Sequence, residues 1–173
     1  MEKTIRLAGI ERHSSVNGPG IRYTIFFQGC LHHCKGCHNR DTWPRDKGNI
    51  VSVEKLLEDI RTTKYIDGVT FSGGDPFYQA DALLEIAKEL KKEEMSLWCY
   101  TGWTYEQIRD GKAGRKAKEV LSYLDVLVDG PFIREKRSES CLFRGSVNQR
   151  LIDLKKSLKD GQATELSSLN YGL

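Results

Sequence analysis

The sequence predicts an α/β fold with a mainly parallel sheet of about five or six strands. Short apolar runs typical of buried strands alternate with longer segments in which apolar residues have helical spacing. The chain has 173 residues, enough for one domain with a hydrophobic core and too few for two ordinary domains. We therefore expect a single domain over residues 1–173, with too few strands for a complete eight-stranded (β/α) barrel.

The strands are predicted from short runs rich in β-branched, aliphatic and aromatic residues. These runs cover residues 22–27, 68–72, 96–100, 124–129 and 149–154. Turn-forming residues interrupt the chain after two of them, at Gly73-Gly74-Asp75-Pro76 and at Asp129-Gly130-Pro131. The boundaries of the strands therefore follow from the turns as well as from the apolar runs.

The helices are predicted from apolar residues spaced three and four positions apart. Residues 52–63 begin with Ser52, a residue type that caps helices well. The same spacing predicts helices over about 79–92 and 116–123. Thr104-Tyr105-Glu106-Gln107 has the form of a capping box, in which a threonine and a glutamine satisfy the first backbone donors of a short helix.

Every unusual loop of the chain follows a predicted strand. These loops are the cysteine-rich segment after residue 27, Gly73-Gly74-Asp75-Pro76, Thr101-Gly102-Trp103 and Asp129-Gly130-Pro131. In open α/β sheets, ligands bind beyond the carboxyl ends of the strands. We therefore expect the four loops to meet at one rim of the sheet and to form the active site there.

Composition and charge exclude several classes of protein. The net charge is +3, and no dense basic stripe suggests a nucleic-acid partner. No apolar run is long enough to cross a bilayer, so we expect no membrane partner. Met1-Glu2-Lys3-Thr4 lacks the apolar stretch of a signal peptide, and we expect a cytoplasmic protein.

Three of the five cysteines lie within eight consecutive residues, from Cys30 to Cys37. In a cytosolic chain such clustering indicates metal binding or catalysis rather than a disulfide framework. Thiolates are soft ligands, so the candidates are zinc and an iron–sulfur cluster. Three thiols leave two alternatives: His32, His33 or His38 completes a Cys₃His zinc site, or one coordination position is open, as in catalytic metal sites. We expect Cys99 and Cys141 to be small buried or incidental thiols.

Further motifs surround the C-x3-C-x2-C spacing, in order from about residue 11 to about residue 154. They are Val16-Asn17-Gly18-Pro19-Gly20-Ile21-Arg22, Phe26-Phe27-Gln28-Gly29-Cys30, Cys37-His38-Asn39, Phe71-Ser72-Gly73-Gly74-Asp75-Pro76, Tyr100-Thr101-Gly102-Trp103, Val128-Asp129-Gly130-Pro131-Phe132 and Phe143-Arg144-Gly145-Ser146 followed by Asn148-Gln149-Arg150. Together they resemble the anaerobic ribonucleoside-triphosphate reductase-activating proteins, a family of the radical S-adenosylmethionine (radical SAM) superfamily. The resemblance implies an incomplete (β/α) barrel of the radical SAM type.

The resemblance also implies a set of cofactor ligands. Cys30, Cys34 and Cys37 would be the catalytic and metal-binding residues, each binding one iron of a [4Fe–4S] cluster. The fourth iron would be open to chelate S-adenosylmethionine. The methionyl ammonium of that cofactor would contact the segment Gly73-Gly74-Asp75, where glycines allow close backbone approach.

One position departs from the pattern of the wider superfamily. The residue before the third cysteine is often aromatic and contacts the adenine of the cofactor, whereas here it is Gly36. The backbone near Gly36 and Cys37, or the side chain of His38, would then take this contact. These two alternatives stay open on the sequence alone.

The activity implied by the resemblance is the activation of a partner protein. One-electron reduction would split S-adenosylmethionine into methionine and a 5′-deoxyadenosyl radical. This radical would remove hydrogen from a glycine Cα in the large catalytic subunit of anaerobic ribonucleoside-triphosphate reductase. An electron donor such as a flavodoxin-like protein would supply the electron.

Two other functions and two further segments complete the expectations. The alternatives are an activase of another glycyl-radical enzyme, for which the chain looks too short, and a non-catalytic Cys₃His zinc module. The basic segment from Arg134 to Arg144 is a candidate docking surface for the partner. The polar tail from about 155 to 173 is expected to be flexible or to contact the partner.

Overall fold

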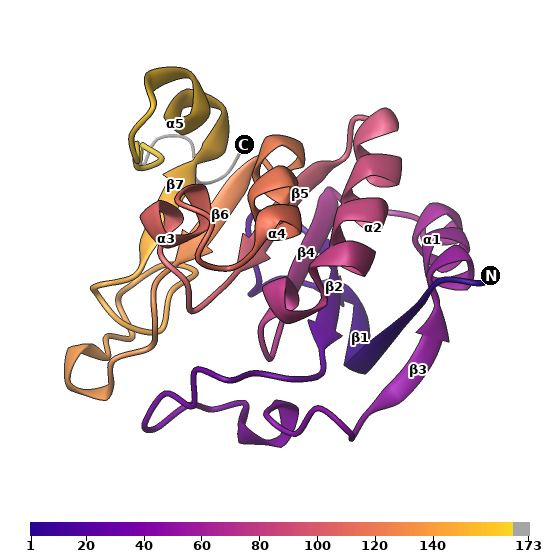
Figure 1. Ribbon diagram of the computed structural model, residues 1–173, viewed down its shortest axis with the longest axis horizontal. Coiled ribbons are helices and arrows are strands. Elements are labelled where there is room, and N and C mark those ends of the chain that lie inside the picture. Colours follow the sequence, from indigo (N-terminus) through magenta and orange to yellow (C-terminus); the bar gives the residue numbers. More distant parts are fainter. Residues whose placement is uncertain (168–173) are drawn as a thin grey trace.

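The computed structural model describes residues 1–167, which form one seven-stranded sheet with helices packed on it (Figure 1). The strands are β1 Thr4–Ser14, β2 Arg22–Phe27, β3 Asn49–Ser52, β4 Gly68–Gly73, β5 Ser96–Tyr100, β6 Val126–Asp129 and β7 Arg150–Asp153. The α-helices are α1 Val53–Thr62, α2 Ala80–Lys92, α3 Tyr105–Arg109, α4 Arg115–Val120 and α5 Leu154–Asp160. Single 3₁₀ turns lie at Arg40–Thr42, Pro76–Gln79, Leu121–Tyr123 and Arg134–Lys136.

The order of strands in the sheet is β3-β1-β2-β4-β5-β6-β7. The four central strands, β2, β4, β5 and β6, are parallel to one another. The flanking strands are antiparallel to their neighbours: β1 to β2, β3 to β1 and β7 to β6. The mixed α/β class with a parallel centre is thus confirmed, whereas the barrel stays a prediction.

The predicted count of five or six strands is wrong, because β1 and β3 were not predicted. In β1 the side chains that face the core are those of Ile5 and Leu7, while most of the remaining strand is exposed or half-buried. In β3 no residue is buried, and Ile50 is 62% exposed. Because few of their side chains are buried, the sequences of these two strands show little apolar pattern. The Asn17-Gly18-Pro19-Gly20 segment of the first motif consequently joins β1 to β2.

The two faces of the sheet differ in chemistry. Helices α1, α2 and α4 cover one face (Figure 1), where alternate strand residues such as Ile25, Phe71 and Cys99 belong to the main core. Because successive strand residues point to opposite faces, their neighbours Ser72 and Tyr100 lie on the other face. Much of that face is polar and buried, since it also carries the side chains of Arg22, Thr24 and Thr70.

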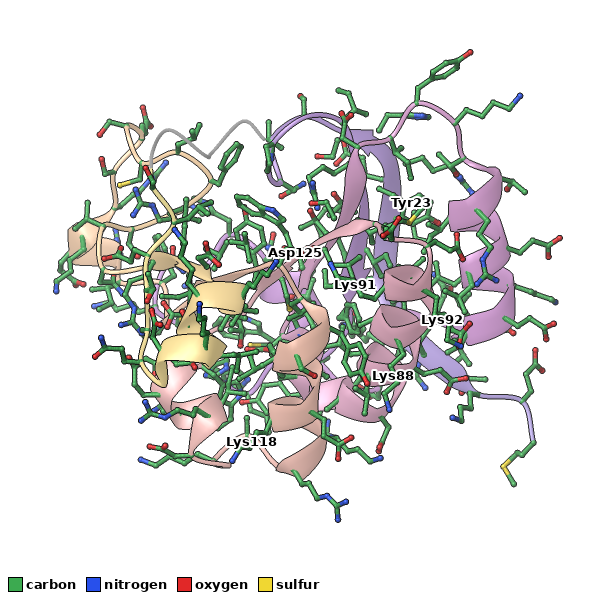
Figure 2. All side chains as sticks on the ribbon, turned by 90° about the horizontal axis from the view of Figure 1, so that it is seen from above. Tyr23, Lys88, Lys91, Lys92, Lys118 and Asp125 are labelled. Atoms are coloured by element: carbon green, nitrogen blue, oxygen red, sulfur yellow. The ribbon has the colours of Figure 1, made fainter. Side chains whose placement is uncertain are left out.

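The predicted helix caps are present. Ser52 accepts a hydrogen bond from the Lys55 backbone N–H at the start of α1. Thr104 and Gln107 form the reciprocal capping box at the start of α3, which confirms the pattern found in the sequence. In the last turn of α2, Lys91 points toward Asp125, with which it forms a 2.7 Å ion pair (Figure 2).

The first part of the predicted tail contains regular structure and backbone hydrogen bonds to the sheet. Helix α5, Leu154–Asp160, takes up the beginning of this tail. Beyond α5, the Leu166 N–H donates to the Leu151 carbonyl, and the Asp153 N–H donates to the Thr164 carbonyl. These bonds hold the segment after α5 against β7. Residues 168–173 of the predicted tail lie outside the described residues.

Across residues 1–167, the structure contains no helix with the length and apolar character required to traverse a bilayer.

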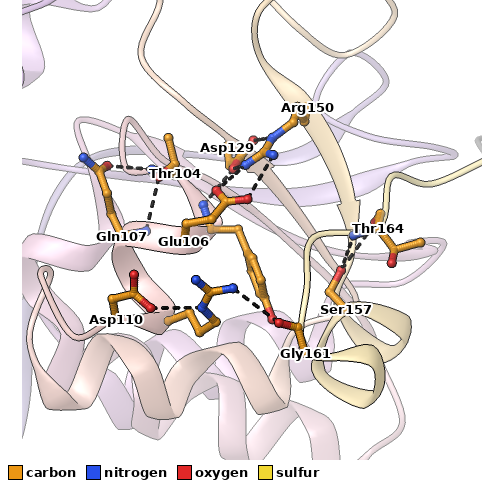
Figure 3. A network of polar contacts seen from close by, with 11 residues as sticks. Thr104, Glu106, Gln107, Asp110, Asp129, Arg150, Ser157, Gly161 and Thr164 are labelled. Carbon is orange, nitrogen blue, oxygen red and sulfur yellow. Dashed lines mark hydrogen bonds and ion pairs between the residues drawn. The ribbon is translucent and has the colours of Figure 1, made fainter.

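An ion-pair network around the buried Asp129 joins β6, β7 and α3 (Figure 3). Asp129, at the end of β6, is 1% exposed and accepts two hydrogen bonds from Arg150, at 3.0 and 2.6 Å. Asp129 also accepts a hydrogen bond from the Tyr105 backbone N–H, which begins α3. Arg150 in addition binds both carboxylate oxygens of Glu106, and these hydrogen bonds lower the pKa of Glu106. The lowered pKa means that this contribution to stability is present at neutral pH and is lost as the pH falls through the folded-state pKa.

We predict that Arg150→Met destabilises the protein strongly, because it leaves the buried Asp129 carboxylate without its cation. The expected loss in the free energy of unfolding is about 2–3 kcal/mol, measured by urea denaturation at pH 7. Arg115→Met is the matched control, since Arg115 is 92% exposed in its ion pair with Glu119 and should contribute little. Equal stability of the two variants would contradict the role assigned to the network.

Candidate functional site

The four loops that follow the parallel strands meet at one rim, as the sequence predicts. The glycine turn after β4 contacts the end of β2, where the Gly74 N–H donates to the Phe27 carbonyl (2.8 Å), and the cysteine loop, where the Asp75 N–H donates to the Gly29 carbonyl (2.9 Å). The loop after β6 contacts the loop after β5, because Gly130 N–H donates to the Trp103 carbonyl. The carboxyl ends of the central strands therefore form a single site.

The cysteine loop folds tightly over residues 30–39. Cys30 is buried, Cys34 and Cys37 are half-buried, and all three are free thiols. The Cys37 N–H donates to the Cys34 carbonyl, and the Asn39 N–H donates to the Cys37 sulfur at 3.4 Å. The turn needs left-handed backbone at Gly36, where φ is +80°.

Burial favours the neutral form of these thiols. It raises the pKa of Cys30 to about 11 and also raises the pKa of Cys34. Both thiols are therefore protonated at neutral pH, and a metal that binds them must displace protons. Within residues 1–167, no group of three or more His, Cys, Asp and Glu side chains is gathered closely enough to surround a single metal ion.

The glycines of the turn after β4 are required by the chain's own backbone. A Cβ on Gly73 would lie 2.4 Å from the Phe27 nitrogen, and a Cβ on Gly74 would lie 2.3 Å from the Gly29 carbonyl oxygen. Gly73 also has a φ of +98°. Close approach to the end of β2 thus explains Gly73, and close approach to the cysteine loop explains Gly74, in addition to any approach by a ligand.

Asp75 is the most heavily bonded side chain of the site, and it is fully buried. One carboxylate oxygen, Oδ2, accepts hydrogen bonds from His32 Nε2 (2.8 Å), Thr101 Oγ1 (2.8 Å) and the Gly102 N–H (2.9 Å). The other oxygen, Oδ1, accepts from the Phe77 N–H. The carboxylate therefore ties three rim loops together rather than facing an open space.

The neighbouring histidines have different surroundings. The ring of His33 is exposed and stacks on Trp43 with a centroid separation of 4.5 Å. The ring of His38 lies 5.8 Å from that of Phe132.

Gly36, where the superfamily often has an aromatic residue, lies close to another segment of the chain. A Cβ on Gly36 would be 3.1 Å from the Arg134 side chain. The cysteine loop is therefore in contact with the beginning of the basic segment.

A cavity of about 600 Å³ opens on the sheet face that the helices leave uncovered. Its lining includes Asn39 from the cysteine loop, and Ser72 and Tyr100 from the ends of β4 and β5. Residues 139–145 form the opposite side of the cavity. This volume is within the range of ligand-binding pockets in proteins.

Part of this site was missed by sequence reasoning. Tyr100 and Phe143 line the cavity, although the sequence analysis named them only as parts of motifs. The ring of Phe143 packs edge-on against the ring of Trp98, with 5.4 Å between centroids. The available signal was the alternation in β5, which sends Trp98 and Tyr100 to the same face. The other two cysteines agree with the sequence: Cys99 is buried in the core, and Cys141 is a half-buried thiol in the cavity wall.

The residues present fit a [4Fe–4S] cluster. Such clusters are held by thiolates, and the loop offers three free thiols on a tightly turned backbone. The Asn39 N–H that points at the Cys37 sulfur is the kind of donor that stabilises thiolate ligands. None of the three thiols is committed to a disulfide.

Comparisons with known proteins identify a family and a similar structure. The chain matches the family described as a 4Fe-4S single cluster domain over residues 16–152. The crystal structure of QueE from Escherichia coli superposes with a TM-score of 0.48 at 22% identity, covering 58% of this chain and 53% of that one. A structural likeness of this size carries no argument about function.

Curated relatives share one name, anaerobic ribonucleoside-triphosphate reductase-activating protein. The Vibrio cholerae protein is 39% identical over 142 residues, which cover 78% of this chain and 88% of the relative. The protein of Enterobacteria phage T4 is 37% identical (79% and 86% covered), and that of Escherichia coli strain K12 is 31% identical (78% and 89% covered). The chain therefore belongs to the family of anaerobic ribonucleoside-triphosphate reductase-activating proteins.

Proposed function

We propose that this protein cleaves S-adenosylmethionine reductively at a [4Fe–4S] cluster and generates a glycyl radical on the large subunit of anaerobic ribonucleoside-triphosphate reductase. The observation that carries the proposal is the contact between the three-thiol loop and the Gly-Gly-Asp turn at the carboxyl ends of the parallel strands. The shared name of the relatives supports the choice of target, and the family match supports a cluster over zinc.

Each thiol has a defined part in this proposal. Cys30, Cys34 and Cys37 would hold three irons, leaving one iron open for the cofactor. When bound, the cluster supplies the electron that cleaves the cofactor's carbon–sulfur bond. The protein's own contribution is to bind, orient and shield the reacting groups.

The cavity beside the loop supports a proposal for where the cofactor binds. We propose that S-adenosylmethionine lies between the cysteine loop and the uncovered face of the sheet, with its methionyl group near Gly73 and Gly74. The adenine would lie near Gly36 or His38, which border Arg134 and Phe132 respectively. Asp75 would act here by holding the turn, because its carboxylate is buried and already has four hydrogen bonds.

The basic segment after β6 is the proposed docking surface for the reductase. Arg134 touches the cysteine loop, and Lys136 and Arg137 are exposed. Two apolar side chains at the cavity mouth are also exposed, Val16 (71%) and Leu142 (50%). Exposed cations and apolar residues beside a cavity suit the entry of an extended protein segment.

The first prediction from the proposed function concerns cluster ligation. Cys34→Ala should lose stable cluster binding, because two thiolates cannot hold the cluster securely. Cys99→Ala is the matched control, since Cys99 lies in the core of β5 and should leave iron content unchanged. Iron and sulfide analysis after anaerobic reconstitution measures both. A full cluster in Cys34→Ala, or iron loss in Cys99→Ala, would contradict the ligand assignment.

The second prediction tests the proposed function directly. Electron paramagnetic resonance (EPR) of the reconstituted, reduced protein should show a [4Fe–4S]⁺ signal, and adding S-adenosylmethionine should change that signal. The change is expected because the cofactor binds an open iron. An unchanged signal would refute an open site, and a protein that contains zinc without a cluster would return the chain to the class of zinc modules.

The third prediction concerns docking. Lys136→Glu combined with Arg137→Glu should slow formation of the glycyl radical on the reductase by about tenfold at low salt, because association is steered by charge. Lys116→Glu combined with Lys118→Glu makes the same charge change on α4 and should have little effect. Equal slowing by both double variants would show that net charge matters and that the basic segment is not the docking surface.

A further inference from the structure

His32 lies at the centre of the contacts between the cysteine loop and the rest of the rim. Its Nε2 is 2.8 Å from Asp75 Oδ2, and the two side chains are 16% and 0% exposed. Since a carboxylate only accepts hydrogen bonds, Nε2 is the donor. A hydrogen bond to a charged group in such a buried position is stronger than one in water.

The His32 ring is fixed by packing as well. It lies 5.2 Å from the Trp103 ring and 5.5 Å from the Tyr78 ring, measured between centroids. The backbone of Gly102 closes a further side, because a Cβ there would lie 2.5 Å from the ring. The ring therefore has one position, set by the loop after β5 and by the turn after β4.

We propose that His32 is a positioning residue that sets the distance between the three thiols and the Gly73-Gly74 turn. The bond from His32 reaches Asp75, which directly follows that turn, and His32 itself lies between Cys30 and Cys34. A shift of the loop would separate the open iron from the groups that bind the methionyl part of the cofactor. This inference rests on the proposed function, because it assigns His32 a part in the same site.

The adjacent histidine provides a matched control within the same loop. His33 is exposed and stacks on Trp43, whereas His32 points to the buried carboxylate. Both changes to alanine remove an imidazole between the same two cysteines. They differ in whether the hydrogen bond to Asp75 is lost.

The test measures how tightly S-adenosylmethionine binds to the reconstituted, reduced protein, by titrating the change in the EPR signal. His32→Ala should require at least about tenfold more cofactor for half of the change, a factor that corresponds to 1.4 kcal/mol. His33→Ala should stay within about twofold of the unchanged protein. His32→Gln should recover most of the loss, because its amide N–H can donate to Asp75.

The outcomes separate this inference from the proposed function. If the unchanged protein shows no response to S-adenosylmethionine, the proposed function fails. If it responds and His32→Ala binds the cofactor equally well, or His32→Gln does not recover binding, the positioning role fails while the function stands.

A second variant decides the question if His32→Ala does not fold or takes up no cluster. Gly102→Ala keeps both His32 and Asp75 in the sequence but displaces the His32 ring, because the new Cβ would overlap that ring. It should weaken cofactor binding by at least about tenfold as well. Binding equal to that of the unchanged protein would overturn the inference.

Discussion

The arrangement of the rim loops depends on the hydrogen bonds that the buried carboxylate of Asp75 accepts. This carboxylate receives donors from the cysteine loop, from the loop after β5 and from the turn after β4. A carboxylate without exposure to water must have such partners, because leaving it unpaired would cost several kcal/mol. The loops supply the hydrogen-bond donors that the carboxylate needs, and the same hydrogen bonds hold the loops in position.

The division of the sheet into two faces follows from the period of two along each strand. One face collects the apolar side chains and is covered by α1, α2 and α4, which provide most of the core. The other face holds polar residues, among them Arg22 and Tyr100, and borders the cavity. Arg22 shows how well this face is arranged: burial lowers its pKa to about 10, yet it donates to Thr70, Val69 and Ser96. The same face also carries a small apolar cluster, made by Trp98, Val126, Val128 and Leu151.

Much of the fold could be predicted because the central strands are short, largely apolar runs and clear turn sequences follow them. The predicted strands 22–27 and 96–100 match β2 and β5 residue for residue. Strands β1 and β3 escaped prediction because few of their side chains are buried. In the site, the cysteine spacing and the meeting of the loops were readable from local sequence. The bond between His32 and Asp75 was not, because 43 residues separate them and only the packed rim brings them together.

The segment after α5 has a consequence for how the protein behaves at high concentration. An edge strand with unpaired backbone groups can pair with another chain and begin aggregation. Here Thr164 and Leu166 bond to β7, and Glu165 bridges to Ile152, so this side of the sheet is already occupied. On the opposite side, β3 is only four residues long, which offers little to a neighbour. A chain shortened to Asp160 would keep its site residues, but the outer edge of β7 would be unpaired and could bind other copies of the chain.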